Sequence, residues 1–243
     1  MAIIQKNPLR MCGRLERCWL FTFQTSPAAA RQLLPGVLEP ITHNGFAFWN
    51  VVITRLQAMR PWPLPAWIGV GYWHAAYRLY VRFHRPAGPP VDGLYFVRSD
   101  CDSHLMRVAG NLLTDFRFSF APIGCQERAE QVELSIQAPD APARALLARR
   151  PPASLPAHSA FSSPDEAKAF LEYEPFGIGA GPAGEVNVVP VVRDETAWQT
   201  KLLQVKSAVW GFFTDMEVRH EICYEVAPIE YQWQRGRVYR SHS

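Results

Sequence analysis

The residues best suited to chemistry lie on one face of the segment 74–84. Apolar and polar side chains alternate here, so an extended backbone places His74, Arg78 and Tyr80 together on the polar face. A guanidinium binds carboxylates and enolates through paired hydrogen bonds, and an imidazole titrates near neutral pH. This face predicts a site for a small anionic or carbonyl-containing molecule, with Arg78 as the anion anchor and His74 as the candidate catalytic acid or base.

The same residues also have structural interpretations. Arg82, near the following turn, is expected in water, whereas Arg78 fits a solvated strand face and a cavity lining equally well. A lone histidine in an aromatic-rich strand is more often packed and hydrogen-bonded than catalytic. If Arg78 points inward, its charge requires a partner, either a protein carboxylate such as Asp100 or an anionic ligand.

Other candidate sites have weaker support in the sequence. Asp100 and Asp102 could form an acid–base pair, but capping of a helix that begins near Ser103 is the favoured interpretation. The glycine-rich run 177–181 lacks the G-x-G-x-x-G pattern and predicts a flexible loop, or a lid, rather than a phosphate cradle.

Neither a metal site nor a cofactor is expected. The sequence has no H-x-H, H-E-x-x-H or C-x-x-C pattern, and this argues against a zinc site. The odd number of cysteines also argues against a disulfide scaffold, so they are expected to be reduced and mostly packed. The five cysteines are scattered along the chain, at Cys12, Cys18, Cys101, Cys125 and Cys223.

Short alternating segments run through most of the chain. Residues 77–84 and 93–98 flank a Pro/Gly-rich turn and predict an antiparallel hairpin. Residues 139–156 are interpreted as a surface excursion. Further strands are expected at 46–56, 114–121, 132–137, 186–192 and 219–226, and short helices after Ser26, near Ser103, and from Ser163 to about Tyr173.

This pattern has no βαβ rhythm, so a parallel α/β fold is disfavoured. The fold class predicted is mostly β (α+β): a closed antiparallel β-barrel with a few peripheral helices. The interior of such a barrel can hold one small ligand.

Length and composition support one domain. The 243 residues are 48% apolar and 12% aromatic, and we expect a single domain over 1–243 with loose ends at 1–14 and 232–243. A net charge of +3 without a Lys/Arg run predicts no nucleic-acid partner. The apolar run 18–23 is too short to span a bilayer and no signal-peptide pattern is present, so a cytoplasmic protein without a membrane partner is expected.

Three stretches of the chain resemble a known family. Residues 77–81, 93–102 and 109–111 are similar to the YqjF-like family of uncharacterised proteins, in the acetoacetate decarboxylase-like superfamily. Weaker similarity continues through 59–61 and 170–198. The resemblance implies a cone-shaped β-barrel around a closed cavity, and a homo-oligomer. Within these stretches Arg78, Tyr80, Arg98, Asp100 and Asn111 are the predicted ligand-binding residues.

The resemblance does not carry the decarboxylase chemistry over. The decarboxylases form a Schiff base through one of two adjacent lysines, and the similar place here, residues 114–117, has none. The lysines of the whole chain are Lys6, Lys168, Lys201 and Lys206, and none has an evident claim to be a desolvated nucleophile. His74 stands where the decarboxylases carry a glutamate.

The predicted function is binding of a small anionic or carbonyl-containing ligand without Schiff-base decarboxylase activity. Two alternatives stay open: a lyase or hydrolase that acts on a carbonyl compound by acid–base chemistry, and a non-catalytic interaction domain. A closed, polar-lined cavity would favour the first two over the third.

Overall fold

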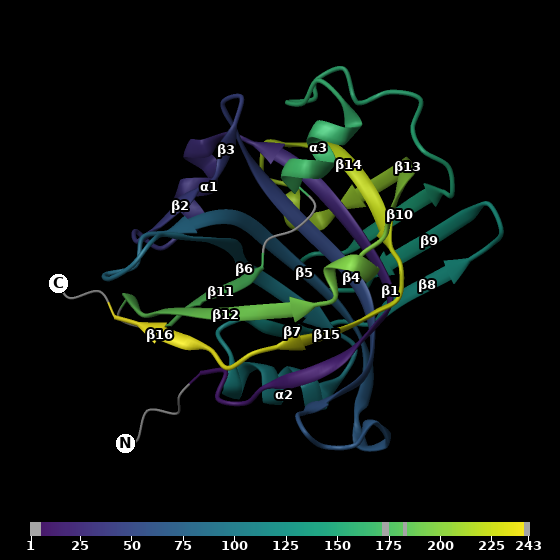
Figure 1. Cartoon of the computed structure of the whole chain (residues 1–243). Helices are drawn as coiled ribbons and strands as arrows, with labels where there is room; N and C mark the ends of the chain where they lie inside the picture. The colour runs from purple at the N-terminus through teal and green to yellow at the C-terminus, as the bar shows by residue number, and fades with distance from the viewer. Residues whose placement is uncertain (1–5, 172–174, 182–183, 241–243) are drawn as a thin grey trace.

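The computed structural model describes residues 6–171, 175–181 and 184–240, and their strands form one continuous sheet. Seven strands of this sheet close into a barrel, because β1 pairs with β4 as well as with β15. In order around the barrel they are β4 (Phe46–Pro61), β5 (Val70–Phe83), β6 (Val91–Cys101), β11 (Phe176–Ala180), β12 (Val186–Arg193), β15 (Ile229–Trp233) and β1 (Met11–Thr25). The predicted β-barrel is confirmed (Figure 1).

The predicted hairpin is confirmed, with β5 antiparallel to β6 throughout. One contact of the barrel departs from the antiparallel prediction, since β11 lies parallel to β6. Between these two strands the chain makes a long crossover, the connection that parallel neighbours require.

A second group of strands extends from β1 and packs against the outside of the barrel wall. It runs β14 (Val218–Val226), β13 (Thr200–Trp210), β10 (Ala143–Ala148), β9 (Gln131–Ile136) and β8 (Ile123–Glu127), and we call it the arm. The largest apolar cluster lies between arm and barrel, and it contains Trp19, Trp49, Tyr77 and Leu134. The side chains on the outer face of β1, β4 and β5 are therefore buried although they point away from the barrel interior.

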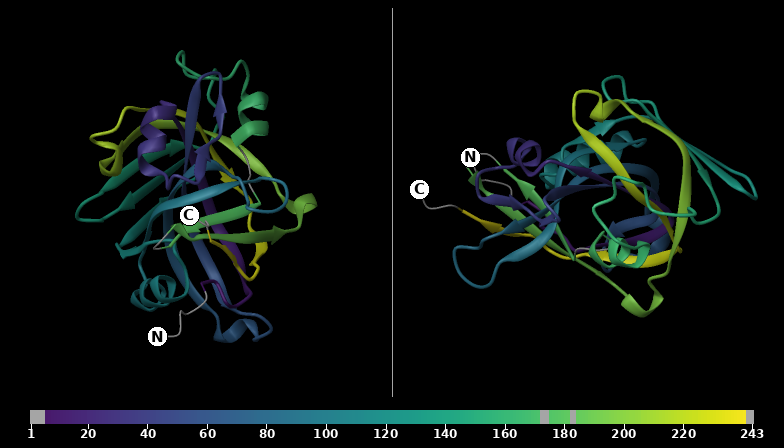
Figure 2. Two further views of the ribbon diagram at one scale, coloured as in Figure 1. Left: turned by 90° about the vertical axis from the view of Figure 1, so that its left-hand side faces the viewer. Right: turned by 90° about the horizontal axis from the view of Figure 1, so that it is seen from above.

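Two helices cover the ends of the barrel (Figures 1 and 2). Helix α3 (Pro164–Leu171) is capped by Ser163, whose hydroxyl accepts from the Glu166 amide at 3.1 Å. The helix packs Ala167 and Leu171 into the apolar cluster inside the barrel, which we call the interior cluster. Helix α2 (His104–Leu113) is capped by Ser103 and lies at the opposite end. The predicted extension of α3 to Tyr173 falls outside the described residues.

The remaining elements are short and lie around the barrel. They are α1 (Pro27–Leu33), β2 (Leu38–Pro40), β3 (Thr42–His43), η1 (Ala66–Ile68), β7 (Phe118–Phe120), η3 (Glu195–Ala197), η4 (Gly211–Phe213) and β16 (Arg237–Tyr239). Within the described ranges, no helix combines the length and apolar character needed to cross a bilayer.

Several predicted loops are strands in the structure. The expected loose ends are wrong in part, because β1 begins at Met11, β15 reaches Trp233 and β16 follows it. The surface excursion at 139–156 contains β10, and the glycine-rich run 177–181 is largely β11, a strand of the barrel. Conversely, the strand expected at 114–121 shrinks to β7. Pairing with strands distant in the sequence contributes to these differences, as β10 pairs with β13 and β11 with β6.

Helix α2 buries a different face from the one its apolar residues suggest. Leu105, Val108 and Leu112 recur at helical spacing, yet their side chains are between 53% and 61% exposed. The inward face carries Gly110, where an added Cβ would lie 2.4 Å from the Phe118 ring. A residue without a side chain is therefore required where α2 approaches β7.

Candidate functional site

The barrel encloses a cavity of about 110 Å³, which we call the inner cavity. Its wall is mostly apolar and aromatic, with contributions from all seven barrel strands. A few polar side chains interrupt this wall, namely Asn50 and Thr54 from β4, His74 and Arg78 from β5, and Arg193 from β12. An apolar chamber with a few convergent polar groups is the usual form of a small-molecule site.

Arg78 faces the inner cavity, as the alternation of β5 predicted. Its neighbours Tyr77 and Leu79 point the opposite way and are completely buried against the arm. The guanidinium donates from Nη2 to the Asn50 side-chain carbonyl and lies over the Phe96 ring, 5.5 Å from its centroid. Burial lowers the pKa of Arg78, but the group remains a cation at neutral pH.

No carboxylate neutralises Arg78 within the described part of the chain. None of the ion pairs there includes it, and its Nε is buried without a hydrogen-bond partner. A guanidinium inside a barrel with one neutral acceptor is only partly compensated for its desolvation. The inner cavity therefore carries an unneutralised positive charge.

Tyr80 supports this arrangement from behind the cavity wall. Its hydroxyl accepts from Asn50 Nδ2 at 2.8 Å and donates to the main-chain carbonyl of Leu171 at the end of α3. The Tyr224 hydroxyl donates to the same carbonyl at 2.6 Å. Because its amide nitrogen is held by Tyr80, Asn50 presents its oxygen to Arg78. The structure thus gives Tyr80 a positioning contact to Asn50.

His74 lies on the cavity wall and is neutral. Burial, with a smaller contribution from the charge of Arg78, lowers its pKa to about 3. The ring stacks on Phe118 with 5.2 Å between centroids, and its buried Nε2 has no partner among the described residues. His74 can therefore exchange a hydrogen bond with a ligand, while its low pKa makes it a weak base.

Arg193 is a cavity residue that the sequence analysis missed. Its side chain is only 4% exposed, with the guanidinium 3.2 Å from the centroid of the Trp198 ring and an ion pair to Glu195 at 3.1 Å. Like Val189 and Val191, it lies at an odd position of β12, and Val189 is part of the interior cluster. This alternation is the feature of the sequence that could have identified Arg193 as a residue of the barrel interior.

Arg98 and Asp100 do not line the inner cavity, so the structure does not bring these two predicted site residues together with Arg78. Tyr77 pairs with Arg98 while Arg78 pairs with Phe96, so Val97 is an extra, bulged residue. The bulge turns Arg98 and Asp100 to the outer face. There Arg98 binds Asp100, which is fully buried, and also Asp140 of the arm at 2.6 Å.

Asn111 also lies outside the inner cavity, where it bonds to the backbone of β7. Its side chain donates to the Phe118 carbonyl at 2.7 Å and accepts from the Phe118 amide at 2.8 Å, and so it attaches α2 to β7. The helix cap is Ser103 alone, because Asp102 accepts from the Trp73 amide at 2.7 Å instead. Neither aspartate caps α2.

The segment similar to the Schiff-base lysines supplies an aromatic ring to the interior. Phe116 stacks on Phe96 at 4.1 Å between centroids, while Asp115 forms an ion pair with Lys6 at 3.7 Å. All of the chain's lysines are among the described residues, and none lines the inner cavity. The one thiol on this wall, Cys18, is not a nucleophile at neutral pH, because burial raises its pKa to about 12.

A second cavity of about 320 Å³ adjoins the first at the α2 end of the barrel, and we call it the outer chamber. Its lining is largely apolar, and α2 contributes Met106, Ala109 and Leu113 to it. The two cavities share five wall residues: Leu56, His74, Phe96, Tyr231 and Trp233. His74 therefore lies between a charged chamber and an apolar one.

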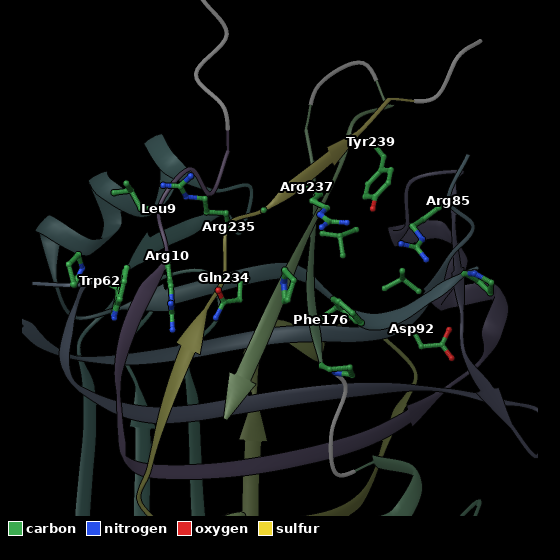
Figure 3. A pocket seen from close by; sticks show the side chains of 17 residues that line it. Leu9, Arg10, Trp62, Arg85, Asp92, Phe176, Gln234, Arg235, Arg237 and Tyr239 are labelled. Atoms are coloured by element: carbon green, nitrogen blue, oxygen red, sulfur yellow. The ribbon is translucent and has the colours of Figure 1, made fainter. Parts of the chain in front are cut away.

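An open groove of about 1280 Å³ lies outside the barrel (Figure 3). It is lined by Arg10, Arg85, Arg235 and Arg237, whereas its one described acidic residue, Asp92, is paired with Arg82 at 2.6 Å. Arg235 and Arg237 are exposed to solvent, where a guanidinium needs no partner. The groove is a basic surface, but the buried and unneutralised cation lies in the inner cavity.

The described residues do not contain three His, Cys, Asp or Glu side chains grouped as metal ligands would be. The polar groups that line the inner cavity include two guanidiniums, an amide, hydroxyls and a neutral imidazole. These groups suit hydrogen bonding to an anion more than cation ligation.

Comparison with known proteins gives a family and a fold. The family DUF2071, described as an uncharacterized conserved protein, matches residues 13–176. No curated protein matches the chain.

Three solved structures illustrate the shared fold. An acetoacetate decarboxylase-like enzyme from Sphingomonas wittichii RW1 is 14% identical with a TM-score of 0.63, over 99% of this chain and 96% of that one. The enduracididine biosynthesis enzyme MppR complexed with pyruvate is 14% identical with a TM-score of 0.60, over 100% and 94%. Acetoacetate decarboxylase from Legionella pneumophila subsp. pneumophila str. Philadelphia 1 is 11% identical with a TM-score of 0.62, over 95% and 88%.

Proposed function

Since the chain belongs to the DUF2071 family and has the acetoacetate decarboxylase-like fold, we propose that it binds a small carboxylate or 2-oxo acid in the inner cavity. The observation that carries the proposal is Arg78, a cation inside the barrel that no described carboxylate neutralises. A bound carboxylate would supply the missing charge and accept two hydrogen bonds from the guanidinium. The similar MppR structure is complexed with pyruvate, an acid of this class.

The size of the inner cavity limits the ligand's polar part. An apolar cavity of about 150 Å³ holds benzene, so 110 Å³ accommodates roughly four to six non-hydrogen atoms. A carboxylate with an adjacent carbonyl group fits this range. Asn50 and His74 stand beside Arg78 in the wall and can donate to or accept from the second oxygen function.

In this proposal the protein does not form a Schiff base with its ligand. That chemistry requires a desolvated amine next to the substrate carbonyl, and the cavity wall contains no lysine. Acid–base catalysis on a carbonyl compound is the second candidate, with His74 as the base. A pKa of about 3 makes the imidazole weakly basic at neutral pH, so ligand binding is favoured over catalysis.

The test is calorimetric titration with acetate, propionate, pyruvate and acetoacetate. We expect at least one acid to bind the wild-type protein, and Arg78→Met to weaken that binding roughly 10- to 100-fold, the effect of losing a hydrogen bond to a charged group. Arg82→Met is the matched control on the same strand, because Arg82 is exposed and paired with Asp92. Equal binding by Arg78→Met of an acid that binds the wild type would refute the proposal, and so would failure of these acids and of longer carboxylates to bind.

Borohydride reduction in the presence of acetoacetate tests the chemistry separately. We expect mass spectrometry to find no lysine adduct. An adduct on any of Lys6, Lys168, Lys201 or Lys206, together with carbon dioxide release that its mutation abolishes, would establish Schiff-base decarboxylation instead.

A further inference from the structure

The barrel interior has one charged end and one apolar end. The inner cavity contains the guanidinium of Arg78, and the outer chamber is about three times larger and largely apolar. Its one cationic lining residue, Arg60, already donates to the carbonyls of Ala58 and Leu64 at 2.7 and 2.8 Å. The two chambers adjoin, because His74 and Trp233 are among the residues that line both of them.

The rim of the outer chamber is also apolar. Leu9, Ile68 and Leu105 line the chamber and are 38% to 61% exposed. These residues come from the N-terminal segment, the 3-10 turn after β4, and α2, and Figure 1 shows the last two at the same end of the barrel. Apolar side chains that line a chamber and also reach solvent are typical of an entrance for an apolar ligand.

We propose that the ligand is an amphiphilic carboxylate, with its head group at Arg78 and an apolar tail in the outer chamber. The proposal rests on the proposed function, since it uses the same anion anchor, and it adds the chemical class of the tail. Burying a hydrocarbon tail in this chamber removes apolar surface from water on both partners. A short acid alone would leave the larger chamber unfilled.

The chamber volume sets the length of the tail. On the scale by which about 150 Å³ holds benzene, 320 Å³ holds roughly 8 to 12 carbon atoms. Each buried methylene strengthens binding about fourfold. Affinity should therefore rise steeply from acetate to medium-chain acids and stop rising near ten carbons.

The experiment titrates wild-type protein with straight-chain carboxylates from two to fourteen carbons, below their micelle concentrations. Decanol and decyltrimethylammonium serve as probes with the same tail and without an anionic head. We expect the fourfold steps and the plateau for the acids, and at least 10-fold weaker binding of both non-anionic probes. Arg78→Met should weaken binding of every acid by a similar factor.

Ala109→Trp tests the position of the tail, and Ala109→Leu is a milder version for use if the larger side chain prevents folding. Ala109 lines the outer chamber from α2, so both variants should move the plateau to shorter acids and leave acetate and propionate unaffected. Val108→Leu is the matched control on the same helix, where the side chain is 58% exposed.

The outcomes separate this inference from the proposed function. Short acids that bind through Arg78 without any gain in affinity with length would overturn the amphiphilic ligand and leave the carboxylate site standing. An effect of Ala109→Trp that is equal for all chain lengths would also overturn it. Binding of no acid of any length would remove the proposed function itself.

Discussion

Replacing Arg78 by methionine should separate binding from stability, because this arginine forms no ion pair with any residue that the structure describes. Arg98→Met is the natural comparison: the same substitution on the adjacent strand, on the opposite face of the sheet. Arg98 holds the fully buried carboxylate of Asp100, whereas Arg78 holds only the amide of Asn50. The two variants should therefore change the free energy of unfolding in different directions.

The contacts set the magnitudes. Arg78→Met loses one hydrogen bond from a charged donor, worth about 1.5–3 kcal/mol, and a ring contact worth about 0.5–2 kcal/mol. It also removes the desolvation cost of a cation inside the barrel, which is several kcal/mol. We expect a net change between zero and about 2 kcal/mol of added stability, a rise in Tm of roughly 0–8 °C for a chain of this size.

Arg98→Met should destabilise the fold by about 3 kcal/mol or more, because Asp100 is left buried without its cation. Burial already raises the pKa of Asp100, and loss of Arg98 would raise it further. A raised carboxyl pKa means that the folded state binds the proton more tightly than the unfolded state. The loss of stability in Arg98→Met should therefore be larger at pH 8 than at pH 5, because Asp100 of the folded protein takes up a proton on acidification and is then no longer a buried charge.

Urea unfolding of both variants and the wild type, without added carboxylate, measures these differences. Circular dichroism and size-exclusion chromatography provide the control that each variant is folded. A loss of more than about 2 kcal/mol in Arg78→Met would contradict the reasoning, since it would show that Arg78 stabilises the barrel by itself. Unchanged stability of Arg98→Met would contradict the assignment of the Arg98–Asp100 pair.

Two further predictions concern His74 and β11. The pKa of His74 is lower in the folded protein than in the unfolded chain, so on acidification the unfolded chain takes up the proton first. Between pH 7 and pH 5 the free energy of unfolding of the wild type, measured in urea, should therefore fall by about 2 kcal/mol relative to that of His74→Gln. The same pH dependence in both proteins would contradict this. In Gly177→Val the new Cβ would lie 2.6 Å from the Trp233 ring, so calorimetry should show weaker carboxylate binding and urea unfolding a loss of stability of about 1–3 kcal/mol. Gly181→Ala is the control, because the nearest contact of its Cβ is at 3.4 Å. Equal behaviour of the two variants would be inconsistent with close packing of the wall at Gly177.

The sequence determined the features that depend on near neighbours. The alternation of β5 placed His74, Arg78 and Tyr80 on the face opposite Tyr77, and the structure agrees. Ser26 and Ser103 cap the helices that follow them, since a cap requires only the next turn of backbone. The residues similar to the YqjF-like family also predicted the barrel, which the structure confirms.

Only the tertiary structure decided the composition of the site. One bulged residue, Val97, moved Arg98 and Asp100 from the cavity to the outer face, and a bulge is defined by the partner strand. Arg193 became a cavity residue because β12 closes the barrel wall, and a glycine-rich run became β11 because β6 and β12 supply its hydrogen bonds. Alternation along a strand defines two faces, but which face encloses a cavity depends on how distant strands meet around it.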